Sequence, residues 1–220
     1  MPDFDAIFFD FDGVLLDSEP LHWACWTEAL APLDIRVEWD YYRDHYLGVA
    51  DRDMIPLIAA RADPPRNWEA LWERYPVKRE CLRKRLEQPP FLPELSGMLA
   101  EVRRGRKLAV VSTSVRVEVE PALIAGGIRH YFDAVITGEN TARHKPAPDP
   151  YLFAARQLAA QNPLVLEDSA PGIASGRAAG FEVLAVPDAA SMPALLRRRL
   201  AEGGPGKGSG TPAARSGKEA

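Results

Sequence analysis

Short apolar runs alternate with helix-length segments along most of this chain. The runs are rich in Ile, Val, Leu and Phe, and they predict buried strands over residues 6–9, 108–111, 134–136, 164–166 and 183–186. Helical patterns of crossover length occupy residues 117–125, 150–160 and 172–179, the second with Asp149 as a predicted N-cap and Pro150 at its first position. This alternation predicts an α/β fold with a doubly wound, Rossmann-like parallel sheet covered on both faces.

Residues 17–90 interrupt this alternation. They predict helices over residues 20–30, 40–47, 53–61 and 68–86, and Pro76 should kink or split the last of these. The block contains all five Trp and both Cys of the chain but none of its eight Phe. We therefore predict a separate helical insertion after the first strand, whose tryptophans pack a small core of their own.

The chain is thus divided into three parts. Residues 1–16 and 91–202 form the predicted α/β core, and residues 17–90 form a helical cap domain. Residues 203–220 are rich in Gly, Pro, Ser and charged side chains and lack apolar periodicity, so they are predicted to be disordered.

Composition and charge exclude several classes of partner. The net charge of −4 and the pI of about 5.7 argue against a nucleic-acid-binding protein. No stretch approaches the roughly 18 to 20 apolar residues of a membrane-spanning helix, and the acidic start is unlike a signal peptide. The two cysteines are too few for a disulfide framework. We expect a cytoplasmic protein, monomeric or weakly dimeric, without nucleic-acid or membrane partners.

Polar side chains follow three of the predicted strands at the points where they end. They are Asp10, Asp12, Ser112, Thr113, Ser114, Glu167 and Asp168. Ligands of an open parallel sheet bind beyond the carboxyl ends of its strands, so these side chains should meet at one edge. Four carboxylates crowded there would raise one another's pKa unless a cation lay among them. Because no Cys or His accompanies the carboxylates, their oxygen ligands favour Mg²⁺ over Zn²⁺.

Phosphoryl transfer fits this set of residues, because it asks a protein mainly for positioning and charge stabilisation. Asp10 is a candidate nucleophile, since a carboxylate can attack phosphorus and form an acyl phosphate that water later cleaves. Asp12 is a candidate general acid and base, provided that the chain leaves strand geometry near Phe11 or Gly13. Lys145 lies beyond the third strand, before a proline that favours extended backbone, so its ammonium could neutralise the phosphoryl group.

Four segments of the sequence carry a family resemblance. In chain order they are FFDFDGVLLDSE at residues 8–19, VVSTS at 110–114, KPAPD at 145–149 and LEDSAPG at 166–172. Together they resemble the motifs of the haloacid dehalogenase superfamily, in the branch of β-phosphoglucomutase-like phosphatases with a helical cap. The resemblance covers roughly residues 5 to 200 and is specific because all four motifs occur in the family's order.

The resemblance implies a role for each matching residue. Asp10 would be the nucleophile and Asp12 the general acid and base. Ser112 and the Thr113 amide would hold the phosphoryl oxygens, and Lys145 would stabilise the transferring group. The family's Mg²⁺ would be bound by the residues Asp10, Asp12 (through its backbone carbonyl) and Asp168, with Glu167 nearby.

Three positions in the cap resemble substrate-contacting positions of the family. His22 matches a position that helps to couple cap closure to catalysis in the mutase branch, and it could equally be a buried helix residue. Lys78 falls where the family often has a cap lysine that reaches the active site, but it also belongs to a charged run typical of a solvated helix face. Gly48 lies in a segment, residues 47–52, that resembles the family's substrate-specificity loop.

The resemblance implies a magnesium-dependent phosphomonoester hydrolase acting on a small phosphorylated metabolite, such as a sugar phosphate. A β-phosphoglucomutase-type phosphosugar mutase is the alternative. It is weakened because the mutase pattern has a lysine before Gly48 and an arginine at about position 51, where this chain has Leu47 and Asp51. A non-catalytic binding module is a third hypothesis, but such a module should have lost Asp10 or Lys145, and both are present.

Overall fold

A five-stranded parallel sheet forms the centre of the molecule. In the computed structural model, which describes residues 4–47 and 49–202, the strand order is β3-β2-β1-β4-β5. The strands are β1 (Ala6–Phe9), β2 (Lys107–Val111), β3 (Ala134–Ile136), β4 (Pro163–Glu167) and β5 (Glu182–Ala185). The predicted α/β fold class is confirmed, and each predicted strand is found within one residue of its expected bounds. The predicted tail of residues 203–220 lies outside the described residues.

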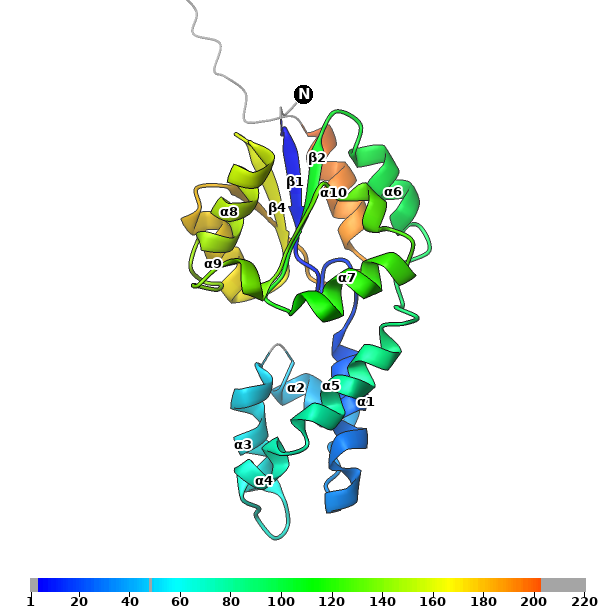
Figure 1. Cartoon of the computed structure of the whole chain (residues 1–220), viewed down its shortest axis with the longest axis vertical. Coiled ribbons are helices and arrows are strands. Elements are labelled where there is room, and N and C mark those ends of the chain that lie inside the picture. Colours follow the sequence, from blue (N-terminus) through cyan, green and yellow to red (C-terminus); the bar gives the residue numbers. More distant parts are fainter. Residues whose placement is uncertain (1–3, 48, 203–220) are drawn as a thin grey trace, which may run out of the picture.

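Helices cover both faces of this sheet (Figure 1). The helices packed on one face are α6 (Leu95–Val102), α7 (Arg116–Ala125) and α10 (Met192–Ala201). On the other face lie α8 (Asp149–Leu158) and α9 (Ala170–Ala178). The central strand β1 is fully buried, and its residues alternate between the two sides, with Ile7 and Phe9 in one apolar cluster and Phe8 in the other. Burial on both faces explains why β1, β2 and β4 are largely apolar runs.

The predicted N-cap of α8 is wrong by one residue. Asp149 is the first residue of α8 and Pro148 is its N-cap, without a side-chain hydrogen bond to the helix. The Asp149 carboxylate instead accepts a hydrogen bond from Arg143 at 3.1 Å. An ion pair with a neighbouring arginine has therefore replaced the capping interaction that the sequence predicted.

Residues 19–85 form a block of helices beyond the carboxyl ends of the strands (Figure 1). The helices are α1 (Glu19–Leu30), η1 (Ala31–Leu33), α2 (Trp39–His45), α3 (Asp51–Arg61), α4 (Trp68–Trp72) and α5 (Tyr75–Arg85). The helix predicted over residues 68–86 is split, and Pro76 lies in the first turn of α5, where a missing N–H costs nothing. All five tryptophans belong to or pack against one apolar cluster of this block, as predicted.

The two cysteines of the chain lie inside the molecule. The cysteines Cys25 and Cys81 are free and buried, and they join the larger apolar cluster of the α/β part.

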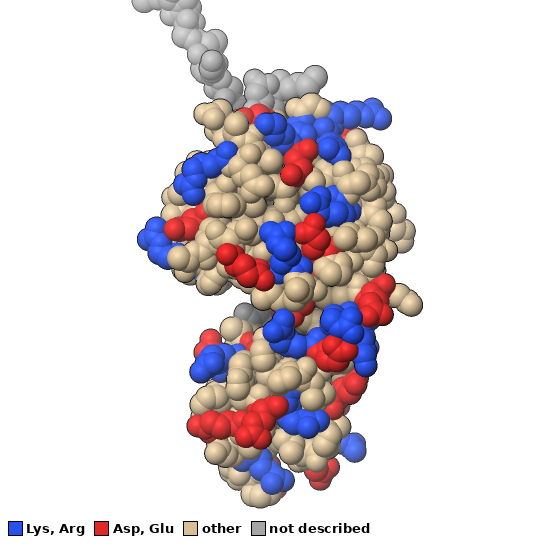
Figure 2. Space-filling model, viewed as in Figure 1, with Lys and Arg blue, Asp and Glu red and all other residues tan. Residues whose placement is uncertain are grey.

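No described helix has the length and apolar composition needed to cross a membrane. On the face shown in Figure 2, basic and acidic side chains are interspersed. The short 3₁₀ turns η2 (Arg129–Tyr131) and η3 (Gly138–Asn140) flank β3.

Candidate active site

A cleft of about 460 Å³ opens where the carboxyl ends of the strands face the helical block. Residues of both parts line it, and they are Asp10, Asp12, Glu19, His22, Tyr42, Val49, Ala50, Asp51, Thr113, Ser114, Lys145, Asp168, Ser169 and Pro171. The convergence predicted from the strand ends is therefore found. Asp10 follows β1 and Asp168 follows β4, and these neighbouring strands lie where the strand order reverses, the usual ligand site of an open α/β sheet.

Asp10 is held in place by two donors. Its Oδ1 accepts a hydrogen bond from the Phe11 backbone N–H at 2.8 Å and lies 2.9 Å from the Lys145 ammonium. Lys145 also contacts Glu167 at 2.5 Å and donates to the Val111 carbonyl at 2.9 Å. Both contacts of Asp10 use Oδ1, and its Oδ2 has no hydrogen-bond partner among the described residues, so this oxygen is available to a ligand.

A tight turn after β1 brings Asp12 into the same cleft. Gly13 adopts φ +73°, in the left-handed region that favours glycine, and its N–H donates to the Leu16 carbonyl at 2.8 Å. A Cβ at this position would lie 1.9 Å from Asp168 Oδ2, so the glycine also permits close approach to that carboxylate. The departure from strand geometry that Asp12 required is therefore found at Gly13.

The loop after β2 supplies hydroxyls and backbone to the cleft. Ser112 is buried, and its Oγ accepts the Ser114 backbone N–H at 3.0 Å. Thr113 and Ser114 are among the residues that line the cleft, and Ser112 is not. Ser114 Oγ donates to Asp12 Oδ2 at 2.8 Å, a contact that no sequence motif signalled.

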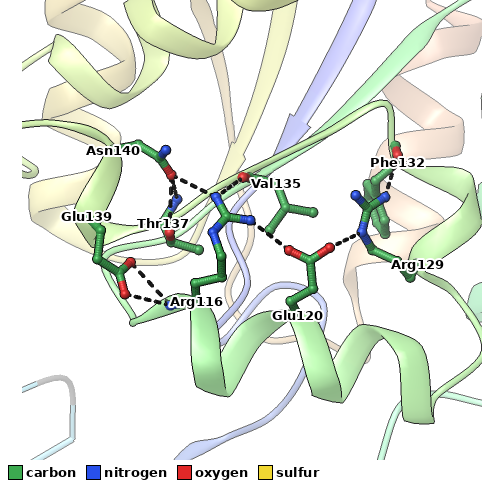
Figure 3. Close-up of polar contacts among 8 residues, drawn as sticks. All are labelled: Arg116, Glu120, Arg129, Phe132, Val135, Thr137, Glu139 and Asn140. Atoms are coloured by element: carbon green, nitrogen blue, oxygen red, sulfur yellow. Dashed lines mark hydrogen bonds and ion pairs between the residues drawn. The ribbon is translucent and has the colours of Figure 1, made fainter.

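A network of charged side chains anchors the helix that follows this loop (Figure 3). Arg116 begins α7, and its backbone N–H donates to Glu139 while its guanidinium donates to the Val135 carbonyl at 3.0 Å. Glu120 bridges Arg116 at 2.6 Å and Arg129 at 2.7 Å. The network ties α7 to β3 and to the turn after it, so it fixes the position of residues 112–114.

The strand ends bring several carboxylates around one ammonium, and the pKa values of these groups shift as a result. Burial, followed by repulsion from Glu167, raises the pKa of Asp10 well above its ordinary value. The same two causes raise the pKa of Asp168 to about 6. Burial alone would lower the pKa of Lys145, but the carboxylates of Asp10 and Glu167 outweigh it and raise this pKa. One ammonium therefore stabilises a cluster of carboxylates that contains more negative charge than it can neutralise.

The carboxylates fit a divalent ion with oxygen ligands. Asp10, Glu167 and Asp168 each offer one ligand atom, and these atoms lie within 4.8 Å of one another. Hard oxygen donors of this kind suit Mg²⁺. Glu167 has further partners, because it is fully buried and its Oε1 accepts from the Tyr151 hydroxyl at 2.5 Å. Burial, followed by the Glu167 charge, raises the pKa of Tyr151, so this hydroxyl remains a neutral donor.

The helical block contributes a second wall of the cleft. Lys78 is 2% exposed, so the interpretation of this residue as part of a solvated helix face is wrong. Its ammonium contacts Asp51 Oδ2 at 2.7 Å and His22 Nδ1 at 2.8 Å. Lys78 is buried because it faces His22 of α1, whereas Arg83, Lys84 and Arg85 of the same basic run are exposed. His22 lines the cleft, while Gly48 lies outside the described residues.

Several residues of the cleft were not singled out in the sequence as site residues. Glu19 and Tyr42 line the wall made by the helices, and the Tyr42 hydroxyl donates to Glu19 at 3.0 Å. Asp51 was noted only as a departure from the mutase pattern, yet it accepts from both Lys78 and Trp26. These residues come from three separate helices, so no local motif could have grouped them.

Comparisons with known proteins agree with this geometry. The family model described as haloacid dehalogenase-like hydrolase matches residues 7–186. The fructose-1-phosphate phosphatase YqaB of Escherichia coli (strain K12) is 32% identical over 188 residues, covering 82% of this chain and 95% of the relative. Protein CbbY of Cereibacter sphaeroides is 30% identical over 193 residues, covering 83% of this chain and 84% of the relative.

Solved structures show the same fold. The crystal structure of CbbY from Rhodobacter sphaeroides in complex with phosphate matches with a TM-score of 0.66 and 27% identity, over 82% of this chain and 84% of that chain. A predicted phosphoglycolate phosphatase from Haemophilus somnus 129PT matches in fold, with a TM-score of 0.75 and 22% identity over 84% and 86% of the two chains. The chain belongs to the haloacid dehalogenase-like hydrolase family.

Proposed function

We propose that this protein is a Mg²⁺-dependent phosphatase that hydrolyses a small phosphorylated metabolite, such as a sugar phosphate, through a phosphoaspartate on Asp10. The observation that carries this proposal is the presence of Asp10, Lys145 and Asp168 in one cleft, with Asp12 beside them. The relative named as a fructose-1-phosphate phosphatase supports it, as does the similar CbbY structure that contains phosphate.

Two displacements at phosphorus account for the reaction. In the first, Asp10 Oδ2 attacks the phosphorus atom, the bond to the leaving oxygen breaks, and Asp12 protonates that oxygen. In the second, Asp12 removes a proton from water, the water oxygen attacks phosphorus, and the bond to Asp10 breaks. The products are an alcohol and inorganic phosphate. The hydrogen bond from Ser114 to Asp12 orients the Asp12 carboxylate between the two steps.

Positioning and charge stabilisation are the work of the surrounding residues. Lys145 holds Asp10 and offers its positive charge to the phosphoryl oxygens, and Thr113 lies in the cleft where its backbone can donate to them. Asp10, Asp168 and the Asp12 carbonyl would hold Mg²⁺, with Glu167 nearby. When bound, this ion would neutralise the carboxylates and the phosphate together.

Residues 17–90 act as a cap domain in this proposal, and residues 1–16 with 91–202 act as the catalytic core. The support is that the cleft lies between them and takes lining residues from both. The cap would limit the size of the substrate and contribute His22 and Lys78 to its recognition. A mutase gains no support from the described residues, because Asp51 brings a carboxylate to the wall where a second phosphate would need a cation.

Phosphate release from a panel of phosphorylated metabolites, with and without Mg²⁺, tests the proposal. We expect turnover that requires Mg²⁺ and is lost in Asp10→Asn. Asp44→Asn is the matched control, since it makes the same chemical change at an exposed site and should retain turnover. Activity that survives Asp10→Asn would contradict the covalent mechanism. Trapping of labelled phosphate on the wild-type protein but not on Asp10→Asn would support it directly.

Location in the cytoplasm and a monomeric or weakly dimeric state stay predictions. The location is supported by the two buried free thiols, which suit a reducing compartment. Sedimentation analysis of the full chain would settle the oligomeric state.

A further inference from the structure

An ion pair joins the helical block to the α/β part of the molecule. Arg79 of α5 donates through Nε to Glu118 Oε1 of α7 at 3.1 Å. The side chain of Glu118 is 15% exposed and that of Arg79 is 40% exposed. Glu118 lies in the first turn of α7, where the helix dipole favours a carboxylate. The carboxylate is therefore stabilised by its own helix, and the arginine of the helical block reaches across to it.

Open space separates the two helices around this ion pair. A cavity of about 310 Å³ is lined by residues of both helices, among them Arg79 and Val117. Val117, the neighbour of Glu118, is 61% exposed, so apolar packing does not close this space. Leu82 and Leu86, near the end of α5, pack into the larger apolar cluster of the α/β part. Apolar contacts therefore anchor the end of α5, and at Arg79 the ion pair spans the space between the helices.

Neighbouring residues of α5 face different parts of the site. Lys78 contacts Asp51 at 2.7 Å and His22 at 2.8 Å in the wall of the cleft. Arg79 is the next residue, and one step along a helix turns the side chain by about 100°, so it faces α7 instead. Because the two residues belong to the same turn of one helix, a displacement of α5 at Arg79 moves Lys78 and its partners as well.

The other end of the ion pair is tied to the loop that carries Thr113 and Ser114. Glu118 belongs to the first turn of α7, which begins shortly after this loop. The network in Figure 3 fixes that helix to β3 and to the turn after it. The ion pair therefore connects a fixed part of the catalytic side of the cleft to the wall that contains His22 and Lys78.

Arg79 is also held from the side of the helical block. Its guanidinium carbon lies 6.0 Å from the centroid of the Tyr75 ring, and Tyr75 stacks on Trp72 with their centroids 4.5 Å apart. Contact with this aromatic stack restricts the arginine side chain, which lowers the entropy lost when the ion pair forms. Because Arg79 remains partly exposed, salt screens the interaction and its contribution is modest.

We propose that Arg79 and Glu118 are positioning residues, whose ion pair holds the helical block at the spacing from the catalytic loop that substrate binding requires. This inference rests on the proposed function and goes beyond it, because neither residue is among those that line the cleft. Loss of the ion pair lets α5 shift relative to α7, so the two walls of the cleft no longer keep one spacing. The pair does not touch the reacting atoms, so its loss weakens substrate binding more than it slows the chemical steps.

Steady-state kinetics with fructose 1-phosphate as the probe give the first test. Arg79→Gln and Glu118→Gln should each raise KM about twofold to fivefold and leave kcat within about twofold of the wild-type value. Glu118→Arg places two like charges opposite each other and should raise KM about tenfold. Combining it with Arg79→Glu restores opposite charges, and this charge swap should return KM to within about threefold of the wild-type value.

Glu80→Gln is the matched control for these variants. Glu80 forms an ion pair with Arg83 at 2.7 Å, and both residues belong to α5. The variant therefore loses an ion pair within one helix and should leave KM unchanged. A purely structural role of Glu118 in α7 would not depend on the charge at position 79, so the charge swap would then fail to restore KM.

A distance measurement keeps the inference separate from the proposed function. Pulsed EPR between spin labels at Glu69→Cys of α4 and Gln157→Cys of α8, both exposed positions, reports the placement of the helical block without turnover. The native thiols Cys25 and Cys81 are buried, so the labels attach at the two exposed positions. We expect a narrow distance distribution in the wild-type background, a broader or displaced one in Glu118→Arg, and recovery in the charge swap.

The outcomes of the two measurements decide between the claims. The inference is overturned if Glu118→Arg leaves either the distance distribution or KM as it was, or if the charge swap restores neither. If the protein does not turn over the probe, the distance distributions alone decide whether the ion pair sets the placement of the block. The proposed function fails separately, if no member of the metabolite panel releases phosphate.

Discussion

Replacing Tyr151 by Phe should destabilise the protein by an amount that the structure allows us to work out. The Tyr151 hydroxyl donates to Glu167 Oε1 at 2.5 Å, and both side chains are fully inaccessible to solvent. Phe keeps the ring, and with it the packing and the contact with Lys145 at 5.3 Å. The substitution therefore removes one hydrogen bond and opens little or no cavity.

The size of the stability loss in Tyr151→Phe follows from the partners that Glu167 retains. A hydrogen bond to a charged group contributes about 1.5–3 kcal/mol. Glu167 keeps Lys145 at 2.5 Å and the Ser169 hydroxyl at 3.2 Å, so no carboxylate oxygen is left without a partner. We therefore expect the lower part of that range, about 1.5–2 kcal/mol, which corresponds to a fall in Tm of roughly 3–8 °C for a chain of this size.

Calorimetric unfolding of the wild type and of two Tyr→Phe variants is the assay. Tyr131→Phe is the control, because the Tyr131 hydroxyl contacts Ser96 at 2.8 Å in an exposed position, where the loss should stay below about 0.5 kcal/mol. If the two variants lower Tm equally, the buried contact with Glu167 contributes no more than an exposed one. The reasoning would then be refuted.

Three other perturbations test the site and its supports. Gly13→Ala should reduce turnover at least about a hundredfold, because its Cβ would lie 1.9 Å from the Asp168 carboxylate. Gly105→Ala is the control, since Gly105 has a similar φ of +77° and open space around it, and this variant should lose only about 1 kcal/mol of stability. Equal activity of the two variants would contradict this prediction. Mg²⁺ at a millimolar concentration of about 100 times its Kd should raise Tm by roughly 5–10 °C, and Asp168→Asn should abolish most of this rise. An unchanged rise in the variant would show that Asp168 does not bind the metal. Hydrogen bonding to Arg129 lowers the pKa of Glu120, so Glu120→Gln should lower the free energy of unfolding by about 0.5–1 kcal/mol at pH 7. The difference between the two proteins should shrink as the pH falls below about 4.5, because the wild-type carboxylate then becomes protonated. A difference that persists at low pH would show that charge is not its cause.

The sequence predicted the α/β part well, because its signals are local. Strands β1, β2 and β4 are largely apolar and almost wholly buried, and each ends in or is followed by polar residues that line or adjoin the cleft. The helix predicted over residues 68–86 is split as expected near Pro76, which lies in the first turn of α5, where a proline is tolerated. The wrong N-cap prediction at Asp149 shows the limit of such local signals. Its carboxylate accepts a hydrogen bond from Arg143 instead of capping α8, and this depends on how the loop before the helix folds.

The four motifs by themselves determined the family, the fold class and the candidate catalytic residues Asp10, Asp12 and Lys145. They could do so because in a parallel sheet the chemistry follows from where each strand ends. The tertiary structure alone decided that Lys78 is buried, that Ser114 donates to Asp12, and that Asp51 forms an ion pair with Lys78. These pairings join residues 27 and 102 positions apart, and no sequence pattern specifies which side chains the folded chain will bring together over such separations.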